Sequence, residues 1–195
     1  MKRLALFDLD GTLTHTDTFL AFLKFVHGKR GFYLGMMRIS PYLVPYKLGL
    51  YPNWRAKEKA LGQFLEGMKH SDVKKYGESF SQDVLPDLLR PKAMDRFNFH
   101  KQQGDHLLIV SASCEEWVKP WASAQEVQAV CTRLIVKDGI VTGQIKGLNN
   151  YGPEKTRRIK ELVDIQEFDE IHAYGDSRGD REMLELATHP HFKPF

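Results

Sequence analysis

Short apolar runs that stop at a polar residue recur along the chain of 195 residues. Residues 4–7 and 107–110 consist entirely of apolar side chains, which is typical of strands buried in a sheet. Residues 126–130 and 170–174 predict two further strands of similar length. The first two runs are followed directly by Asp8 and Ser111, and the last one is followed by Gly175 and then Asp176.

Helical segments separate these strands. Residues 114–124, 153–163 and 181–187 are expected to be helical, and the second of them carries a proline in its first turn. Residues 133–145 are expected to form a hairpin, because an Asp-Gly pair divides two β-branched runs. Strands that alternate with helices predict an α/β fold, a Rossmann-like doubly wound parallel sheet with helices on both faces.

One long segment breaks this alternation. Residues 17–90 are rich in Phe, Tyr, Leu, Met and Lys and contain no convincing strand, so we expect an inserted α-helical domain there. The core domain then comprises residues 1–16 and 91–195. The two junctions of the insertion are expected near Asp17 and Pro91.

Composition and charge exclude only a few classes of protein. The hydrophobic fraction of 42% and the charged fraction of 27% are ordinary for a soluble globular protein. A formal net charge of +3 is too small to indicate a nucleic-acid partner, and we expect none. Cys114 and Cys131 predict no disulfide framework, and the first apolar run meets an acid too early for a signal peptide. We therefore expect a cytoplasmic protein.

The residues that follow the predicted strands carry the chemistry. Asp8 and Asp10 come directly after the first strand, and Ser111 and Asp176 follow two others. Because the carboxyl ends of parallel strands lie at one edge of a sheet, these side chains are expected to meet there. Two carboxylates at the end of a buried strand are costly unless they are paired or bound to a cation. A divalent metal beside a phosphate would satisfy both.

Four motifs in order resemble those of the haloacid dehalogenase superfamily, in its phosphoserine-phosphatase-like branch with a helical cap after the first strand. The motifs are Asp8-Leu9-Asp10-Gly11-Thr12, Ile109-Val110-Ser111, Lys155 within Gly152-Pro153-Glu154-Lys155, and Gly175-Asp176-Ser177-Arg178-Gly179-Asp180. One such motif arises by chance, whereas four at strand ends form a specific signal. The resemblance covers nearly the whole chain and implies a phosphatase that uses Mg²⁺ and acts on a small-molecule phosphate monoester.

The resemblance and phosphoryl-transfer chemistry together suggest a role for each residue. Asp8 is the expected nucleophile, which forms an aspartyl-phosphate, and Asp10 is the expected general acid and base. Mg²⁺ is expected to bind Asp8, Asp176 and the backbone carbonyl of Asp10. Asp180 fits either a metal ligand acting through water or a group that orients Lys155. The expected residues for binding phosphate and substrate are Gly11, Asp17, Ser111, Ala112 and Lys155.

Several of these residues also have an ordinary structural interpretation. Ser111 suits a helix N-cap, and Asp176 and Asp180 suit caps of the last helix. His189 and His191, in a His-Pro-His sequence, are expected to be solvated tail residues rather than metal ligands.

The insertion is expected to determine the choice of substrate. Residues 18–57 contain no acid and seven basic residues, interleaved with aromatic ones. Such a surface either contacts an anionic membrane or a lipid phosphate, or forms the insertion's own small core with its lysines solvated. Prolines and basic residues interrupt the apolar stretch 32–51, so it is not expected to span a bilayer.

The resemblance leaves two substrate classes open, a small metabolite such as phosphoserine and a phospholipid phosphate. Asp17 lies where phosphoserine phosphatases carry the acid that reads the amino group. No arginine stands at the place of their carboxylate-binding arginine, although Arg55, Lys57 and Lys59 lie close to it. The alternative from another class is a non-catalytic membrane- or ligand-binding protein on a phosphatase fold, and the intact set of motif residues argues against it.

Overall fold

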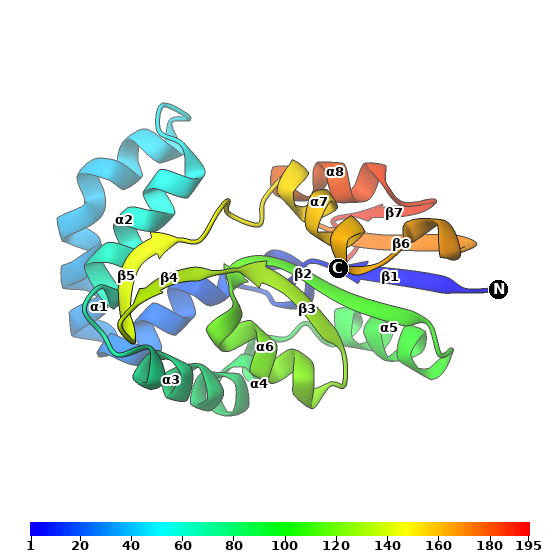
Figure 1. Cartoon of the computed structure of the whole chain (residues 1–195), viewed down its shortest axis with the longest axis horizontal. Coiled ribbons are helices and arrows are strands. Elements are labelled where there is room, and N and C mark those ends of the chain that lie inside the picture. The colour runs from blue at the N-terminus through cyan, green and yellow to red at the C-terminus, as the bar shows by residue number, and fades with distance from the viewer.

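Five parallel strands form the central sheet of the computed structural model, which describes residues 1–195 apart from the side chain of Lys47. The strand order is β3-β2-β1-β6-β7, so the chain winds outward from the central β1 in both directions (Figure 1). The expected doubly wound parallel sheet is confirmed. The strands are β1 (Arg3–Phe7), β2 (His106–Cys114), β3 (Gln128–Thr132), β6 (Glu170–Gly175) and β7 (His189–Phe192).

Helices cover both faces of this sheet because successive side chains of each strand point into two different apolar cores. Ala5 and Phe7 of β1 belong to the core under α5 and α6, and Leu4 and Leu6 belong to the core under α7 and α8. All four side chains are fully buried. The flanking helices are α5 (Pro91–Gln102), α6 (Glu115–Ala124), α7 (Pro153–Leu162) and α8 (Arg181–Glu185).

The segment between β1 and α5 is helical, as expected. Its elements are α1 (Thr18–Lys47), α2 (Asn53–Leu65), α3 (His70–Asp83) and α4 (Leu85–Leu88). Gly28 has a φ of 66° and bends α1, since a glycine adopts this backbone conformation without strain. Within the described part of the chain, no helix has both the length and the hydropathy needed to cross a membrane.

The two ends of the insertion lie side by side. Thr14 and Leu89 form an antiparallel bridge. On either side of it, the His15 amide donates to the Leu88 carbonyl at 2.9 Å and the Arg90 amide donates to the Leu13 carbonyl at 2.8 Å. The chain therefore leaves the sheet and returns to it at a single crossing.

The expected hairpin is present, and it packs against the insertion. Its strands are β4 (Leu134–Lys137) and β5 (Ile140–Ile145), and the turn residues Asp138 and Gly139 have φ values of 50° and 77°, as a tight hairpin turn requires. Backbone hydrogen bonds join β5 to the connection between α2 and α3: Gly67 donates to Val141, and Val141 donates to Met68. The hairpin thus ties the segment after β3 to the insertion.

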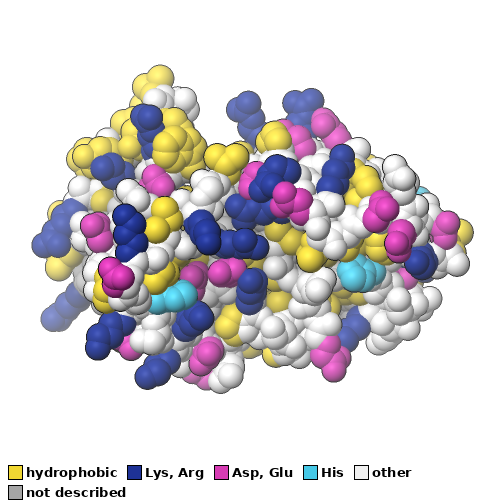
Figure 2. Space-filling model, viewed as in Figure 1, with side chains coloured by type: hydrophobic (Ala, Val, Ile, Leu, Met, Phe, Trp, Pro, Cys, Tyr) yellow, Lys and Arg dark blue, Asp and Glu magenta, His cyan; other side chains and the backbone are white. Residues whose placement is uncertain are grey.

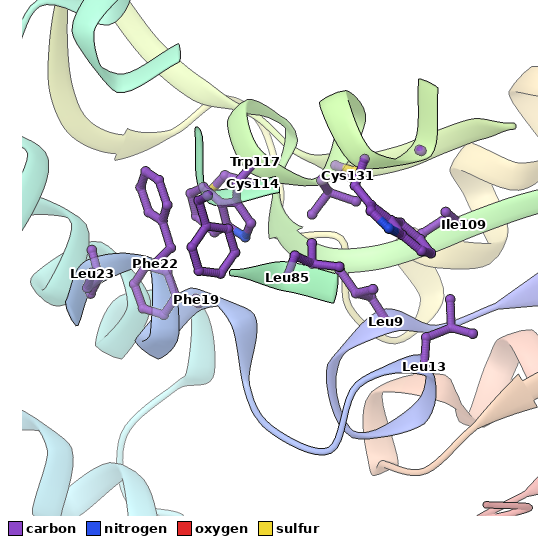
Figure 3. Close-up of a cluster of buried hydrophobic side chains, with 14 of the residues drawn as sticks. Leu9, Leu13, Phe19, Phe22, Leu23, Leu85, Ile109, Cys114, Trp117 and Cys131 are labelled. Atoms are coloured by element: carbon purple, nitrogen blue, oxygen red, sulfur yellow. The ribbon is translucent and has the colours of Figure 1, made fainter. Parts of the chain in front are cut away.

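An aromatic joint fixes the start of α1 against α6 (Figure 3). Phe22 of α1 stacks on Trp117 of α6 with ring centroids 4.4 Å apart, and Phe80 of α3 meets Phe22 edge-on at 5.6 Å. All three rings are fully buried. Because these side chains belong to one cluster that includes residues of the sheet, the first turns of α1 are held rigidly relative to β2.

The structure corrects two expectations. The third strand runs over Gln128–Thr132 rather than residues 126–130, because Glu126 adopts a left-handed φ of 59° in the preceding turn. His189 and His191 do not lie in a tail, since both belong to the edge strand β7, although His189 is exposed to solvent as expected. There His172 stacks on His189 at 4.6 Å, and Tyr174 stacks on His191 at 4.4 Å. A short polar edge strand leaves no hydrophobic alternation by which the sequence could reveal it.

Gly77 provides a test of the packing between insertion and core. A Cβ at this position of α3 would overlap the Glu116 carbonyl oxygen of α6, which is backbone and cannot turn aside. We expect Gly77→Ala to lower the free energy of unfolding by about 2–3 kcal/mol, measured by urea denaturation. The control is Gly62→Ala in α2. A Cβ at this position would lie 3.4 Å from its nearest neighbour, the carboxylate oxygen Oε2 of Glu66. Equal stability of the two variants would contradict this close approach.

Candidate active site

The carboxyl ends of β1, β2 and β6 bring the predicted residues together, at the point where the winding of the sheet reverses. Asp8 follows β1, Ser111 lies in β2, and Asp176 follows β6. Asp180 reaches the same place from the short helical turn Arg178–Asp180. Three carboxylate oxygens, one each from Asp8, Asp176 and Asp180, lie within 4.8 Å of one another.

A buried lysine holds two of these carboxylates. Lys155, in the first turn of α7, is 1% exposed, and its Nζ donates to Asp8 Oδ1 at 2.6 Å and to Asp180 Oδ1 at 2.5 Å. Burial by itself would lower the pKa of Lys155, but the two carboxylates outweigh it and raise that pKa above its ordinary value. Lys155 is therefore charged, and its single positive charge faces two buried acids.

Asp180 is saturated by hydrogen bonds from the protein. Its Oδ2 accepts from the backbone N–H groups of Asp176 at 3.2 Å and Ser177 at 2.9 Å, and from the Ser177 hydroxyl at 2.7 Å. Burial acts to raise its pKa, but Lys155 and the Ser177 donors outweigh that effect and hold the pKa of Asp180 below its usual range. Of the two roles that the sequence leaves open, these bonds favour the orientation of Lys155.

The turn after β1 brings Asp176 close to the other acids. Gly11, in the helical turn Leu9–Leu13, has a φ of 87°, and a Cβ there would lie 2.5 Å from Asp176 Oδ2. Only glycine therefore permits this approach. The Thr12 hydroxyl donates to Asp176 Oδ1 at 3.2 Å. The Asp-Gly-Thr sequence thus positions a side chain that comes from the far end of the chain.

Asp10 has different partners from Asp8, although only Leu9 separates the two residues in sequence. The Thr18 amide at the start of α1 donates to Asp10 Oδ1 at 2.6 Å, and the Ser113 hydroxyl donates to Oδ2 at 2.7 Å. The Ser111 hydroxyl also donates to Oδ2, at 3.3 Å. Asp10 is therefore held by hydrogen-bond donors, whereas Asp8 is held by an ion pair.

Thr18 and Ser113 were not among the predicted site residues. Ser113 stands two positions after Ser111 in β2, so the alternation of a strand places both on one side, and this signal would have sufficed to find it. Thr18 binds Asp10 through its backbone amide, so this contact depends on the start of α1 lying beside Asp10. No local sequence pattern marks it.

The insertion supplies two charged groups near Asp10. Asp17 caps α1 by accepting from the Leu20 amide at 3.1 Å, and partial enclosure together with the charge of Asp10 raises the pKa of Asp17 to about 6. Lys57 of α2 donates from Nζ to the Ala112 carbonyl oxygen and, at 3.3 Å, to Asn149 Oδ1. Asn149 was not predicted either, and it links the loop after β5 to the insertion.

A cavity of about 800 Å³ opens above Asp10 between the insertion and the sheet. Asp17, Lys57, Ala112 and Ser113 line its polar floor. Its wall on the insertion side is largely apolar and includes Phe19, Leu20, Tyr33, Met36, Met37, Leu43, Val44 and Tyr46. The cavity therefore has charged side chains at its floor and a largely apolar wall above them.

The chain belongs to the haloacid dehalogenase-like hydrolase family, whose model matches residues 5–185. It is 34% identical over 198 residues to protein CicA of Caulobacter vibrioides, which covers 98% of this chain and 86% of that protein. A protein of unknown function from Bordetella pertussis has a similar structure, with a TM-score of 0.85, 28% identity, and 96% and 88% of the two chains covered.

A substrate-bound phosphoserine phosphatase shares the fold, with a TM-score of 0.69 and 20% identity over 96% of this chain and 83% of that one. The protein is therefore a hydrolase that has the fold of the phosphoserine-phosphatase-like members of its family. The four sequence motifs identified this family correctly.

The donor set at the site suits a hard divalent cation. The side chains of Asp8, Asp176 and Asp180 offer carboxylate oxygens, which Mg²⁺ prefers to nitrogen or sulfur. Burial raises the pKa of Asp8 well above its ordinary value, and burial together with the charge of Asp180 raises that of Asp176. Lys155 alone thus leaves an excess of negative charge, and a second cation would stabilise both ionised acids.

The charged cluster leads to a prediction about stability. Lys155→Met should lower the free energy of unfolding by about 3–5 kcal/mol, because two buried carboxylates lose their partner. The loss should be smaller in Mg²⁺ than in EDTA, and urea denaturation in both buffers measures it. Lys160→Met, at an exposed position of the same helix, is the matched control and should change stability by about 0.5 kcal/mol or less. An equal loss of unfolding free energy in the two variants would contradict the stabilising role of Lys155 between the buried carboxylates.

Proposed function

We propose that this hydrolase is a Mg²⁺-dependent phosphatase that cleaves a phosphate monoester through an aspartyl-phosphate on Asp8. The observation that carries the proposal is the different surroundings of two neighbouring acids. Asp8 is held by the Lys155 ammonium group, and Asp10 is held by neutral donors at the floor of the cavity. These surroundings support a nucleophilic role for Asp8, beside a cation, and a proton-transfer role for Asp10, which faces the cavity.

The two acids divide the reaction between them. In the first step an Asp8 carboxylate oxygen bonds to phosphorus, the bond from phosphorus to the leaving oxygen breaks, and Asp10 gives that oxygen its proton. In the second step a water molecule gives a proton to Asp10 as its oxygen attacks phosphorus. The bond to Asp8 then breaks, and inorganic phosphate is released.

Cations and N–H donors have to offset the charge of the phosphoryl group. Lys155 provides a fixed positive charge beside Asp8, and Asp180 keeps its ammonium group in place. Mg²⁺, bound by Asp8, Asp176 and the backbone carbonyl of Asp10, would reduce the repulsion between a carboxylate and a phosphate dianion. The Ser111 hydroxyl and the backbone N–H groups of Gly11 and Ala112 are the proposed donors to the phosphoryl oxygens.

The insertion acts in this proposal as a cap over the site. We assign residues 17–90 to the cap domain and residues 1–16 and 91–195 to the core domain. The single crossing at Thr14 and Leu89 supports these limits, because it marks where the chain leaves and re-enters the sheet. The cap contributes Asp17, Lys57 and the apolar wall to the cavity, so it governs the choice of substrate.

The cavity favours a phosphate ester with an apolar leaving group over phosphoserine. Asp17 and Lys57 offer one negative and one positive group, but Asp17 is used as the cap of α1 and Lys57 is bonded to the backbone of Ala112. Apart from Asp10, Asp17 and Lys57, the described lining offers no charged side chain to pair with the ammonium and carboxylate groups of an amino acid, and burying them unpaired is costly. Of the two substrate classes, a phospholipid phosphate therefore fits better than phosphoserine.

The first prediction tests the nucleophile. Asp8→Asn should abolish hydrolysis of p-nitrophenyl phosphate in the presence of Mg²⁺, because an amide oxygen is too weak a nucleophile, while Asp10→Asn should leave a small residual rate. Asp83→Asn, at an exposed position at the end of α3, is the control and should retain full activity. Mass spectrometry after a rapid acid quench should find one phosphoryl group on the wild-type peptide that contains Asp8. Activity retained by Asp8→Asn would refute the mechanism.

The second prediction tests the leaving group. Along a series of linear alkyl phosphates, kcat/KM should rise about fourfold for each added CH₂ until the cavity is filled, because each such group is transferred from water into the apolar cavity. Val44→Asp on the cavity wall should remove this dependence while leaving methyl phosphate hydrolysis unchanged. Leu162→Asp in α7, which lies outside the cavity wall, serves as the control. A preference for phosphoserine over the longer alkyl phosphates would overturn the proposed leaving-group class.

A further inference from the structure

Large apolar side chains are exposed in the turn between α1 and α2 and at the start of α2. Leu48, Leu50 and Trp54, which we call the apolar tip, are 69%, 77% and 46% exposed. In Figure 2, hydrophobic atoms gather at the upper left, where Figure 1 places the turn between α1 and α2. Contiguous exposed apolar surface of this kind on a soluble protein marks a binding surface.

The apolar surface continues from the tip along α1. Tyr33, Met37 and Val44 are 59%, 70% and 57% exposed, and their spacing of four and seven residues places them on one side of the helix. These three side chains also form part of the wall of the cavity above Asp10. One apolar surface thus runs from the tip into the candidate active site.

Basic and aromatic side chains flank the apolar tip on its other side. Arg38, Arg55 and Lys59 line a hollow of about 740 Å³ together with Tyr42, Tyr51 and Trp54. Arg55 lies over the ring of Trp54 at 5.1 Å, and Lys59 lies over the ring of Tyr42 at 5.0 Å. The hollow also contains Glu58 and Glu66, of which Glu58 accepts a hydrogen bond from the Ile145 amide.

Charge and shape together identify the surface that the tip fits. Residues 18–57 contain no acidic side chain, so the segment around the tip attracts a negatively charged surface. Leucines that project from a turn, a tryptophan at their edge and a flanking group of basic residues suit the boundary between lipid chains and headgroups. We propose that the apolar tip docks onto an anionic lipid bilayer, with Leu48 and Leu50 among the acyl chains and Arg38, Arg55 and Lys59 at the headgroup phosphates.

Trp54 makes this docking directly measurable. The chain has three tryptophans, of which Trp117 and Trp121 are buried, so Trp54 is the one whose fluorescence reports on a change at the tip. Titration with phosphatidylcholine vesicles that contain phosphatidylglycerol should shift its emission to the blue, and pure phosphatidylcholine vesicles should bind more weakly. Brominated lipid chains should quench the shifted emission, and high salt should weaken binding. No substrate is present, so the result does not depend on the proposed phosphatase activity.

Two sets of variants separate the apolar from the electrostatic part, with vesicle flotation as the readout. Leu48→Ser combined with Leu50→Ser should weaken binding about tenfold or more, because both side chains lose their apolar environment. Arg38→Gln combined with Arg55→Gln should weaken binding to anionic vesicles about tenfold. The control is Leu162→Ser, which removes an exposed leucine of α7 and should leave binding unchanged. An unaltered melting temperature shows that each variant is folded.

Three results would overturn the proposal. The first is the absence of flotation with anionic vesicles at low salt. The second is equal binding by the wild type and by the double leucine variant. The third is a blue-shifted Trp54 emission without vesicles that disappears on dilution in parallel with dissociation of a dimer measured by light scattering, because the tip would then be an interface between two copies of the chain.

Discussion

The buried contact of Lys155 with Asp8 and Asp180 is the constraint on which the rest of the structure depends. Its three members come from the residue after β1, from α7 and from the turn after β6, so the contact exists only if the sheet has this order and α7 covers the correct face. Removing charges from water costs free energy, and the mutual attraction of the three groups repays the cost only with short, well-directed contacts. Any other strand order would leave these charges buried without partners, so the charged cluster constrains the arrangement of the whole sheet.

A second constraint links the insertion to the chemistry. Asp10 is oriented by the first amide of α1, and the start of α1 is fixed by the stacking of Phe22 on Trp117. The orientation of one candidate catalytic acid thus depends on aromatic packing between insertion and core. The same helix continues past Gly28 to form the apolar wall of the cavity. A single element consequently connects the orientation of the proposed acid with the shape of the substrate space.

Strands and turns that depend on a local residue pattern could be predicted from the sequence. Contacts between residues that only the fold brings together could not. The runs at residues 4–7 and 107–110 predict strands because both their faces are buried, and the Asp-Gly pair predicts its hairpin because the turn needs that chemistry. Lys57 and Asn149 could not be predicted, since each acts through a partner distant in sequence. The edge strand β7 was missed because its histidines stack on one side of the sheet without forming an apolar core.

The hairpin after β3 has a mechanical consequence for the enzyme. Backbone hydrogen bonds from β5 join it to the insertion, while the Lys146 amide donates to the Arg133 carbonyl at 2.8 Å and closes its base. The insertion is therefore attached to the core at the crossing of Thr14 and Leu89, at the stacking of Phe22 on Trp117 and along β5. A body held at one place can swivel freely, whereas attachments that do not share one line leave no axis for a rigid rotation. Any widening of the cavity would then require one of these attachments to open or the insertion itself to bend.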